Sequence, residues 1–315
     1  ESEEGEYTDS FGRMNIYKIF WKAICHNFNS RSDYRDLIAK TFIAEFGIDY
    51  PFIDTRQLII QNLTGEKRRH LMVLTKNMAA LPIVKDTLVA TNQKFEVVIG
   101  SNFEGDNKYF TNMKNLRKVA HCMQKGIKVI MVFADDLFPP LYDILNQHYK
   151  RINRQEFGLI AMGPSTVEFR VHPDFRIIVI IDATRCVNEL DTPLIQRFET
   201  QSLIAKDLAA KNPYLPMLLE SINTMKINIR VAIPCFHPDL QYSLIQKVIS
   251  SVDANSEDFE SKAKSVLKDL LCKLIKPSYM LGIKNNNKSL YDEYLGKYLI
   301  CNFKEFLSKT KSVKR

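Results

Sequence analysis

The sequence lacks the glycine-rich motifs with which common nucleotide-binding folds hold phosphate. Glycine accounts for only 11 of its 315 residues. No stretch matches the phosphate-binding loop GxxxxGK[ST] or the dinucleotide motif GxGxxG. The Gly296-Lys297 pair is followed by Tyr298 and does not follow a predicted strand. Because such loops surround phosphate with backbone N–H groups and a lysine, their absence excludes the ordinary phosphate cradle.

Cysteine motifs and long apolar segments are absent as well. No two of the six cysteines have the C-x-x-C spacing of a zinc knuckle or a redox site. We therefore predict no metal site, and scattered single thiols suit a reducing, cytosolic setting. No apolar run approaches about 18 residues, so no transmembrane helix is expected. The chain begins ESEEGEY, without a methionine or an apolar signal segment, and we expect it to be a piece of a longer protein.

Positive charge is in excess but unevenly distributed. The formal net charge is +8, with four glutamates among the first six residues and five basic residues from Lys304 to Arg315. A basic end of this kind binds nucleic acid or an acidic membrane surface in some proteins. A solvated tail with ordinary surface lysines is the simpler interpretation. We expect no nucleic acid partner and keep a basic nucleic-acid or membrane-surface module as an alternative function.

The N-terminal part of the chain predicts three helices. Apolar residues recur at helical spacing from Met14 to Phe28. Asp33 and Asp54 are suited to cap two further helices, and Gly47 and Gly65 are suited to end them. The prediction is a small helical unit without strands.

From Arg69 onward, short apolar runs alternate with helical patterns, which is typical of βαβ units and a parallel sheet. The predicted strands are Leu71–Leu74, Phe95–Ile99, Lys128–Phe133 and Phe175–Ile181, and the predicted helices are Asn77–Val89, Phe110–Gln124 and Leu141–Tyr149. Two further runs, Phe157–Met162 and Thr166–Val171, flank Gly163-Pro164 and predict a hairpin insertion.

The run Phe175–Ile181 is the centre of this prediction. It is apolar except for Arg176 and rich in β-branched residues, as in a strand covered on both faces. A polar loop is expected from Asp182 to Pro193, which opens a short helix, PLIQRFE.

Beyond Phe198 the alternation fades. Amphipathic helices are predicted at Ser243–Ser250, Phe259–Ile275 and Leu290–Leu307. The chain is thus predicted to be an α/β protein with a helical segment at 1–66, a parallel sheet flanked by helices at 67–205 and a helical subdomain at 206–315.

Three residues after predicted strands are weak candidates for binding a nucleotide. Lys76 follows the first strand, and Asp135 and Asp136 follow the third. Acidic residues at that place hold Mg²⁺ and polarise a water in many nucleotide hydrolases. The alternative, which we favour without a phosphate cradle, is that Asp136 caps the helix near Pro139 and Asp135 is solvated.

Arg197 is the candidate for a catalytic contact with another protein unit. An arginine at the end of a helix that follows a buried strand can stabilise charge on a γ-phosphate across an interface. The alternative is a surface ion pair with Glu189 or Glu199, which contributes little.

The histidines suggest no catalytic or metal site. His26, His121 and His237 lie near cysteines, but two ligands do not make a metal site. We expect His172 to order the Val-His-Pro-Asp turn through side-chain hydrogen bonds. No serine, cysteine or histidine has a local setting that indicates a nucleophile.

Five segments together resemble a known family. RRHLMVLTKNMAAL, FEVVIGSNF, LYDILNQHY, FRVHPDFRIIVI and PLIQRFE, in this order and spacing, are similar to the mysterin family of giant AAA+ ATPases and RING-type ubiquitin ligases. The resemblance runs from about residue 14 to 308 and is strongest between 69 and 198. It implies an AAA+-like fold of the P-loop-NTPase type, in a unit that follows the ATP-competent units of a single-chain ring. Residues 1–66 would then be the helical end of the preceding unit.

The resemblance also carries expectations about function. In that family this unit lacks the glycine-rich loop, and the arginine in PLIQRFE, here Arg197, stands where AAA+ proteins carry a finger. The sequence departs from the family pattern at Asp135-Asp136, where an Asn-Leu-Gln-Asn-like segment is usual. This departure keeps an ATP-binding or hydrolysing unit with an atypical phosphate site as an alternative.

The main expectation is a non-hydrolysing AAA+ module that structures the ring and couples to the ATP site of the preceding unit. Its partners would be neighbouring AAA+ units of the same chain. The resemblance implies no cofactor in this fragment, but ATP, Mg²⁺, zinc and ubiquitin-pathway partners for the parent protein. It also implies a cytosolic setting with association at lipid droplets. The family's RING-type zinc site has no counterpart in these residues.

Overall fold

The computed structural model describes most of the chain in two units. It describes residues 16–30, 32–47, 52–65, 68–76, 79–100, 108–206, 212–224, 229–233, 240–252 and 258–280, with isolated positions at 288, 292, 294 and 295. The chain divides into the units Glu1–Ile204 and Ala205–Arg315. Each unit is considered by itself.

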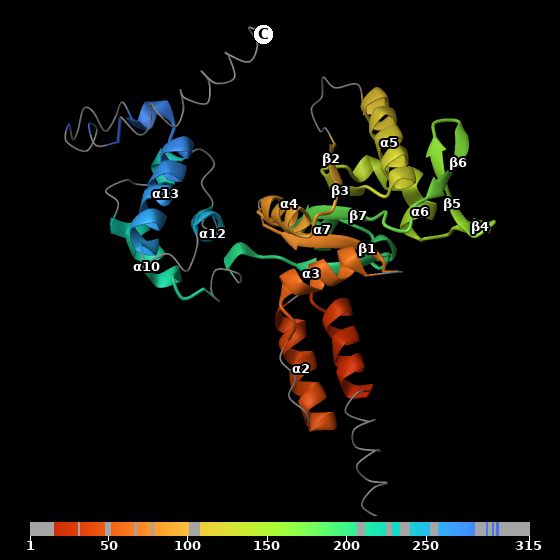
Figure 1. Cartoon of the computed structure of the whole chain (residues 1–315), viewed down its shortest axis with the longest axis horizontal. Helices are drawn as coiled ribbons and strands as arrows, with labels where there is room; N and C mark the ends of the chain where they lie inside the picture. Colours follow the sequence, from red (N-terminus) through yellow and green to blue (C-terminus); the bar gives the residue numbers. More distant parts are fainter. Residues whose placement is uncertain are drawn as a thin grey trace, which may run out of the picture. The chain divides into compact units, whose positions relative to one another are not determined.

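A parallel five-stranded sheet forms the middle of the first unit (Figure 1). Its strands are β1 (His70–Thr75), β2 (Phe95–Ile99), β3 (Lys128–Val132), β7 (Ile177–Asp182) and β8 (Phe198–Ser202), in the order β2-β3-β7-β1-β8. The predicted α/β fold with a parallel sheet is therefore confirmed, and the Phe175–Ile181 run lies in the central strand.

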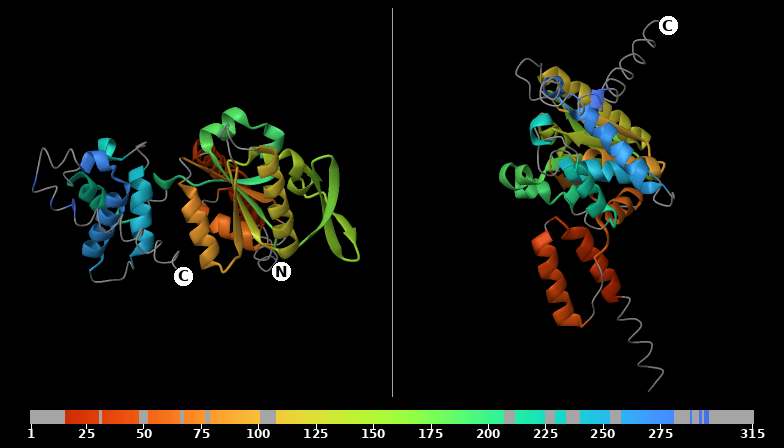
Figure 2. Two further views of the ribbon diagram at one scale, coloured as in Figure 1. Left: turned by 90° about the horizontal axis from the view of Figure 1, so that it is seen from above. Right: turned by 90° about the vertical axis from the view of Figure 1, so that its left-hand side faces the viewer.

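The central strands are buried because helices cover both faces of the sheet (Figure 2). Every residue of β1 and β3 is buried, as are the first five of β7. The helix α5 (Lys108–Lys125) packs on one face, where its Val119 and Met123 join a core with Met72, Val129 and Val179. The helices α3 (Thr55–Thr64) and α4 (Ala80–Ala90) lie on the opposite face. Alternate strand residues thus enter two different apolar layers.

The N-terminal helices pack around an aromatic cluster. Residues 16–27 are helical, followed by α2 (Ser32–Phe46) and α3, and Trp21, Phe42 and Leu58 lie in their shared core. Asp54 caps α3 as predicted, because its carboxylate accepts a hydrogen bond from the Arg56 N–H at 3.1 Å.

Gly65 ends α3 as predicted, and the two remaining predicted ends of these helices had different outcomes. Gly47 follows α2 with a φ of +68°, a left-handed conformation that glycine adopts without strain. α2 begins at Ser32, so Asp33 lies in its first turn rather than before it.

An antiparallel hairpin is inserted between β3 and β7. β5 (Gln155–Met162) and β6 (Ser165–Val171) confirm the predicted hairpin, and a short strand, β4 (Lys150–Ile152), extends it in the order β4-β5-β6. Ile160 and Val171 point into the core beneath α5, which fixes the hairpin to the main sheet.

The structure differs from the sequence prediction around β7 and β8. The expected polar loop contains the helix α7 (Ala183–Glu189), which Asp182 caps by accepting hydrogen bonds from Thr184 N–H at 2.9 Å and Arg185 N–H at 3.4 Å. The predicted PLIQRFE helix is shorter, because α8 ends at Ile195 and Phe198 already opens β8. Phe198 is 2% exposed and joins the core, so burial of its ring favours the strand.

The predicted helix Leu141–Tyr149 is also shorter than expected. Two 3-10 helices, η1 (Asp135–Leu137) and η2 (Pro139–Leu141), precede the single turn α6 (Tyr142–Leu145). Two consecutive prolines begin η2. Because proline has no backbone N–H, neither can donate a hydrogen bond to a carbonyl of a preceding helical turn, so a longer helix is not formed here.

The second unit is helical where it is described. It contains α10 (Leu215–Thr224), α11 (Ile229–Ala232), α12 (Leu240–Ser251) and α13 (Phe259–Leu274), around a core that includes Leu218, Ile245 and Leu267. The predicted helices Ser243–Ser250 and Phe259–Ile275 correspond to α12 and α13. The predicted Leu290–Leu307 helix and the basic stretch 304–315 lie outside the described residues, apart from isolated positions. Across the described residues, no helix combines the length and apolarity needed to cross a membrane.

Candidate functional site

The predicted nucleotide-site residues lie at the carboxyl edge of the sheet. Thr75 and Asp182 end β1 and β7 as paired residues, and Lys76 follows at once. Asp135 and Asp136 lie in η1, just after β3. The carboxyl edge of a parallel sheet is where open α/β folds bind ligands. The topology therefore places Lys76 and the two aspartates at the edge where such a site would be expected.

The junction between β1 and α4 is short and internally bonded. Four residues, 76 to 79, separate the end of β1 from the start of α4, and none is glycine. The Ala80 N–H donates to Thr75 Oγ1 at 3.1 Å, and the Ala79 N–H donates to the Lys76 carbonyl at 3.1 Å. Helix N-termini bind phosphate through unsatisfied N–H groups of this kind. Here two of them already have partners within the protein.

Asp135 is paired with a cation, a contact that neither sequence interpretation included. The Arg185 guanidinium, from α7, forms an ion pair with Asp135, and its Nε lies 2.5 Å from Glu189 Oε2. The hydrogen bonds to Asp135 and Glu189 raise the pKa of Arg185. A guanidinium thus lies against the carboxylate where a nucleotide hydrolase would hold Mg²⁺.

Asp136 does not have the predicted capping role. Ala134 and Phe138 precede η1 and η2, and no side chain caps either of these short helices. Asp136 is exposed inside η1. Within the described residues, no group of three histidine, cysteine or acidic side chains is placed to hold a metal ion.

Arg197 lies at the opposite, amino edge of the sheet. It immediately precedes β8, so the parallel strands separate it from Lys76 and Asp135 by the length of the sheet. Its Cζ lies 3.8 Å from the centroid of the Tyr142 ring, a cation–π geometry. Within the described part of the chain, its guanidinium forms no hydrogen bond or ion pair with the protein. The guanidinium is therefore held in place with its N–H donors unused.

The surface ion pair considered for Arg197 is absent. Glu189 binds Arg185 instead, and Glu199 points into the interior beside His26. The reason is strand alternation: Glu199 is the second residue of β8, on the face covered by α3 and the N-terminal helix, where it is 3% exposed.

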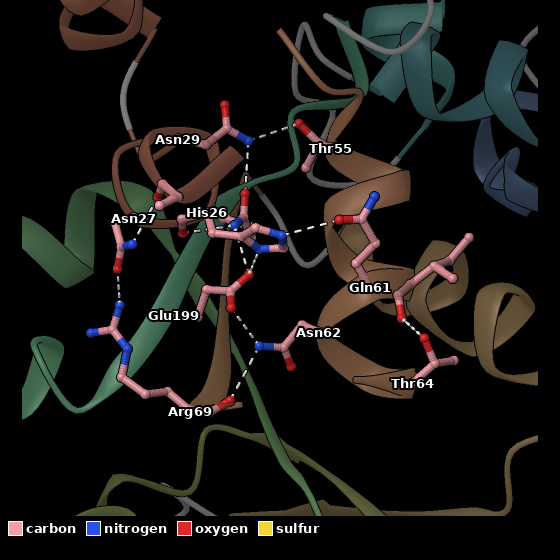
Figure 3. Close-up of polar contacts among 12 residues, drawn as sticks. His26, Asn27, Asn29, Thr55, Gln61, Asn62, Thr64, Arg69 and Glu199 are labelled. Atoms are coloured by element: carbon pink, nitrogen blue, oxygen red, sulfur yellow. Dashed lines mark hydrogen bonds and ion pairs between the residues drawn. The ribbon is translucent and has the colours of Figure 1, made fainter. Parts of the chain in front are cut away.

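A second arginine supports the turn that carries Arg197. The Nη1 of Arg69 donates to the Gln196 carbonyl at 2.9 Å, and its Nη2 donates to Asn27 Oδ1 (Figure 3). Arg69 therefore links the N-terminal helix to the residue just before Arg197. Sequence reasoning missed this contact, because Arg69 and Gln196 are 127 positions apart.

A buried polar network joins β8 to the N-terminal helices, as Figure 3 shows. Glu199 accepts hydrogen bonds from His26 Nδ1 at 2.7 Å, Asn62 Nδ2 at 2.8 Å and Gln201 Nε2 at 3.1 Å. Burial acts to raise the pKa of Glu199, but the hydrogen bonds from these three side chains and the charge of His26 outweigh it, so the pKa is lowered. The carboxylate is therefore ionised in the interior, with its donors in place.

Two further histidines have structural partners. The Asp174 N–H donates to His172 Nδ1 at 3.1 Å, which confirms that His172 orders its turn. His70 is buried, donates from Nε2 to the Ile144 carbonyl at 3.0 Å and accepts the Ile177 N–H at Nδ1, at 3.1 Å. Burial, with the charge of Arg176, lowers the pKa of His70 to about 3. His70 is a neutral structural residue rather than a base.

Comparison with known proteins finds that the central region is similar to one family. Residues 60–209 match the family described as the RNF213 AAA domain. The chain is 34% identical over 163 residues to the E3 ubiquitin-protein ligase RNF213 of Homo sapiens, and 34% identical over 162 residues to that of Mus musculus. It is 32% identical over 177 residues to the E3 ubiquitin-protein ligase rnf213-beta of Danio rerio. These alignments cover 48%, 48% and 54% of this chain, but only 3% of the length of each relative.

Proposed function

Because residues 60–209 of this chain are an RNF213-like AAA+ region, we propose that it is a non-hydrolysing module that structures an AAA+ ring. In this proposal the module also couples to the ATP site of the preceding unit. The match agrees with the mysterin resemblance drawn from the sequence, since RNF213 is mysterin. The chain spans about 3% of the length of the relatives it matches. The proposal therefore treats it as a part of a longer protein.

The observation that carries the proposal is the state of Arg197. Its guanidinium is stacked on Tyr142, with no hydrogen bond to the protein in the described residues, and it stands at the sheet edge away from Lys76 and Asp135. A positioned, always charged guanidinium with unused donors is suited to a phosphate supplied by another unit. In ring NTPases such an arginine stabilises the charge that develops on the γ-phosphate.

Internal bonds at the carboxyl edge of the sheet support the non-hydrolysing part of the proposal. The N–H groups of Ala79 and Ala80 are bonded internally, and Arg185 neutralises Asp135. A triphosphate with Mg²⁺ would have to displace all three interactions. Loss of buried or charge-assisted bonds without replacement costs on the order of 1–3 kcal/mol each.

The test is the Arg197→Ala substitution in the full-length protein, with ATPase rate and nucleotide affinity as readouts. Arginine fingers contribute about 10³- to 10⁵-fold in kcat where they are complete. We expect turnover at the coupled site to fall by at least about tenfold. Arg117→Ala, which removes an exposed arginine from α5, is the matched control and should leave the rate unchanged. An unchanged rate and affinity in Arg197→Ala would refute the coupling.

The alternative is an ATP-binding unit with an atypical phosphate site. Its favouring observation is that Lys76, Asp135 and Asp136 all stand at the carboxyl edge. Equilibrium dialysis of the 315-residue chain with labelled ATP and Mg²⁺ separates the two proposals. Micromolar binding that is abolished by Lys76→Ala would establish the alternative, and absence of binding would support the non-hydrolysing module.

For the parent protein, we propose activity as a ubiquitin-protein ligase with ATP hydrolysis. The support is the name shared by the aligned relatives, each an E3 ubiquitin-protein ligase. ATP with Mg²⁺ and zinc would be its cofactors, and its partners would be neighbouring AAA+ units and ubiquitin-pathway proteins. A cytosolic setting with lipid-droplet association belongs to the same proposal. Ubiquitin transfer by the full-length protein in a reconstituted reaction is its direct test.

A further inference from the structure

Four cations stand side by side along the amino edge of the parallel sheet. The pairing of β3, β7, β1 and β8 places the residues that open or immediately precede these strands in one row. These residues are Lys128, Arg176, Arg69 and Arg197. Neighbouring strands lie about 4.8 Å apart, so the backbones of these four residues are adjacent along the edge. The row therefore gathers four cationic residues at one edge of the sheet.

None of these cations has a carboxylate partner in the described residues. Lys128 Nζ donates to the Asp174 carbonyl at 2.6 Å, and an Arg176 Nη donates to the Gly65 carbonyl at 3.0 Å. Arg69 is held by the Gln196 carbonyl and the Asn27 amide, and Arg197 by the Tyr142 ring. Neutral groups hold all four side chains, and none of the four forms an ion pair in the described residues.

The inner half of the row is deeply buried. Lys128 and Arg176 are 3% and 5% exposed, and the Nε of Arg176 has no hydrogen-bond partner. Burial lowers the pKa of both, and the carboxylate of Asp174, with that of Glu199 for Arg176, acts in the opposite direction. Buried charges are normally paired, because removal from water is costly. An anion at this edge would add a direct partner to this longer-range compensation.

The nearby carboxylates act on these cations only at a distance and form no ion pair with them in the described residues. Glu199 is committed to His26, Asn62 and Gln201, and the side chain of Asp174 is 70% exposed beside His172. The two outer arginines, Arg69 and Arg197, are only partly buried. An arginine has five N–H donors. Arg69 uses two of them in hydrogen bonds with Gln196 and Asn27, and Arg197 uses none within the described chain.

We infer that Arg69 and Arg197 together bind the polyphosphate chain of a nucleotide, with Lys128 and Arg176 adding positive potential from behind. Adjacent guanidinium groups match the geometry of phosphate oxygens and bind them in a bidentate manner. This inference rests on the proposed function, in which Arg197 faces the nucleotide of another unit. It adds Arg69 as a second phosphate ligand. Arg69 also holds the turn that carries Arg197, through its hydrogen bond to the Gln196 carbonyl.

The experiment is calorimetric titration of tripolyphosphate into the 315-residue chain at about 150 mM salt, where weak screening-sensitive contacts are reduced. We expect one binding event, weakened about tenfold or more by Arg197→Ala. Arg69→Lys keeps the charge but removes the planar fork, so it should weaken binding by a similar factor. Arg117→Ala and Lys76→Ala should bind as the unmodified chain does.

Several outcomes would overturn the inference. These are no saturable binding, an equal loss in Arg117→Ala, or a loss in Lys76→Ala without one in Arg197→Ala. Arg197→Ala removes the contact with Tyr142 but no hydrogen bond within the described protein, and a thermal unfolding curve of the variant checks that its fold is retained.

The inference and the proposed function can fail separately. Tripolyphosphate binding that needs both arginines, together with unchanged ATPase activity of full-length Arg197→Ala, would keep the anion site and reject the coupling. Loss of ATPase activity in full-length Arg197→Ala, without any tripolyphosphate binding to the 315-residue chain, would keep the coupling and reject the anion site.

Discussion

Replacing Glu199 by glutamine should undo the junction between β8 and the N-terminal helices. Glu199 Oε1 accepts from His26 and Gln201, and Oε2 accepts from Asn62. A glutamine amide offers only one acceptor oxygen, so its NH₂ group must face at least one of these donors. The variant loses a hydrogen bond to a charged acceptor, worth about 1.5–3 kcal/mol, and leaves a buried donor unsatisfied, at about 1–3 kcal/mol. We expect a loss of roughly 3–5 kcal/mol in the free energy of unfolding.

The measurement is urea unfolding followed by the fluorescence of Trp21. Trp21 is the single tryptophan of the chain and lies buried in the N-terminal helical cluster, on the same helix as His26. The pH dependence adds a second check. Because the pKa of Glu199 is lowered by folding, its stabilisation is present above the ordinary carboxyl pKa and is lost as pH falls through the folded value. The gap between the unmodified chain and Glu199→Gln should therefore narrow on acidification.

The matched control is Glu168→Gln, which changes an exposed glutamate on β6. Surface substitutions of this kind usually change stability by less than about 0.5 kcal/mol. If Glu199→Gln also changed the Trp21 transition by less than about 0.5 kcal/mol, the network would not hold the helices to the sheet.

Three further predictions follow from local geometry. Because folding lowers the pKa of His70 from 6.5 to about 3, its stabilisation is present above pH 6.5 and is lost toward pH 3, by up to about 1.4 kcal/mol per pH unit. His70→Gln should remove this slope from pH-dependent urea unfolding. Asp182→Ala should cost about 1 kcal/mol through loss of the α7 cap, while Asp191→Ala, before α8, should cost almost nothing because it makes no capping bond. Gly126→Ala should lower the thermal midpoint more than Gly47→Ala, since both have positive φ but only at Gly126 would the new Cβ meet an imidazole, at 2.5 Å.

The three central strands of the main sheet were predictable because burial on both faces leaves a local signature. HLMVLT, KVIMV and IIVIID are short, apolar and rich in branched side chains, so their composition alone indicates buried strands. The hairpin was predictable from the Gly163-Pro164 turn between two runs. α7 was missed because ATRCVNE has little apolar periodicity, and its main signal is the single capping residue Asp182.

The candidate site could be predicted only in part, because its decisive contacts are distant in the sequence. The missing glycines were visible directly, but Arg197 was expected at the end of a helix, whereas it lies just before the unpredicted strand β8. The pairing of Arg185 with Asp135 spans 50 positions, and that of His26 with Glu199 spans 173. A local pattern predicts which residues can carry charge, but tertiary packing decides which charges meet. For that reason the alternative ion pair of Arg197 with Glu189 or Glu199 was wrong, and the position of Arg197 at the amino edge of the sheet was not predicted.

The edge position of β8 predicts how a shortened version of this chain would behave in solution. β8 is an edge strand, and the Ser202 N–H at its end donates to the Asn29 carbonyl at 3.0 Å, so the N-terminal segment shields part of the outer margin of β8. A chain cut near residue 66 would lose this cover and present an open strand with free backbone groups. Exposed margins of this type recruit strands from other molecules. Light scattering should then detect self-association in the shortened chain before any change in its helix or strand content.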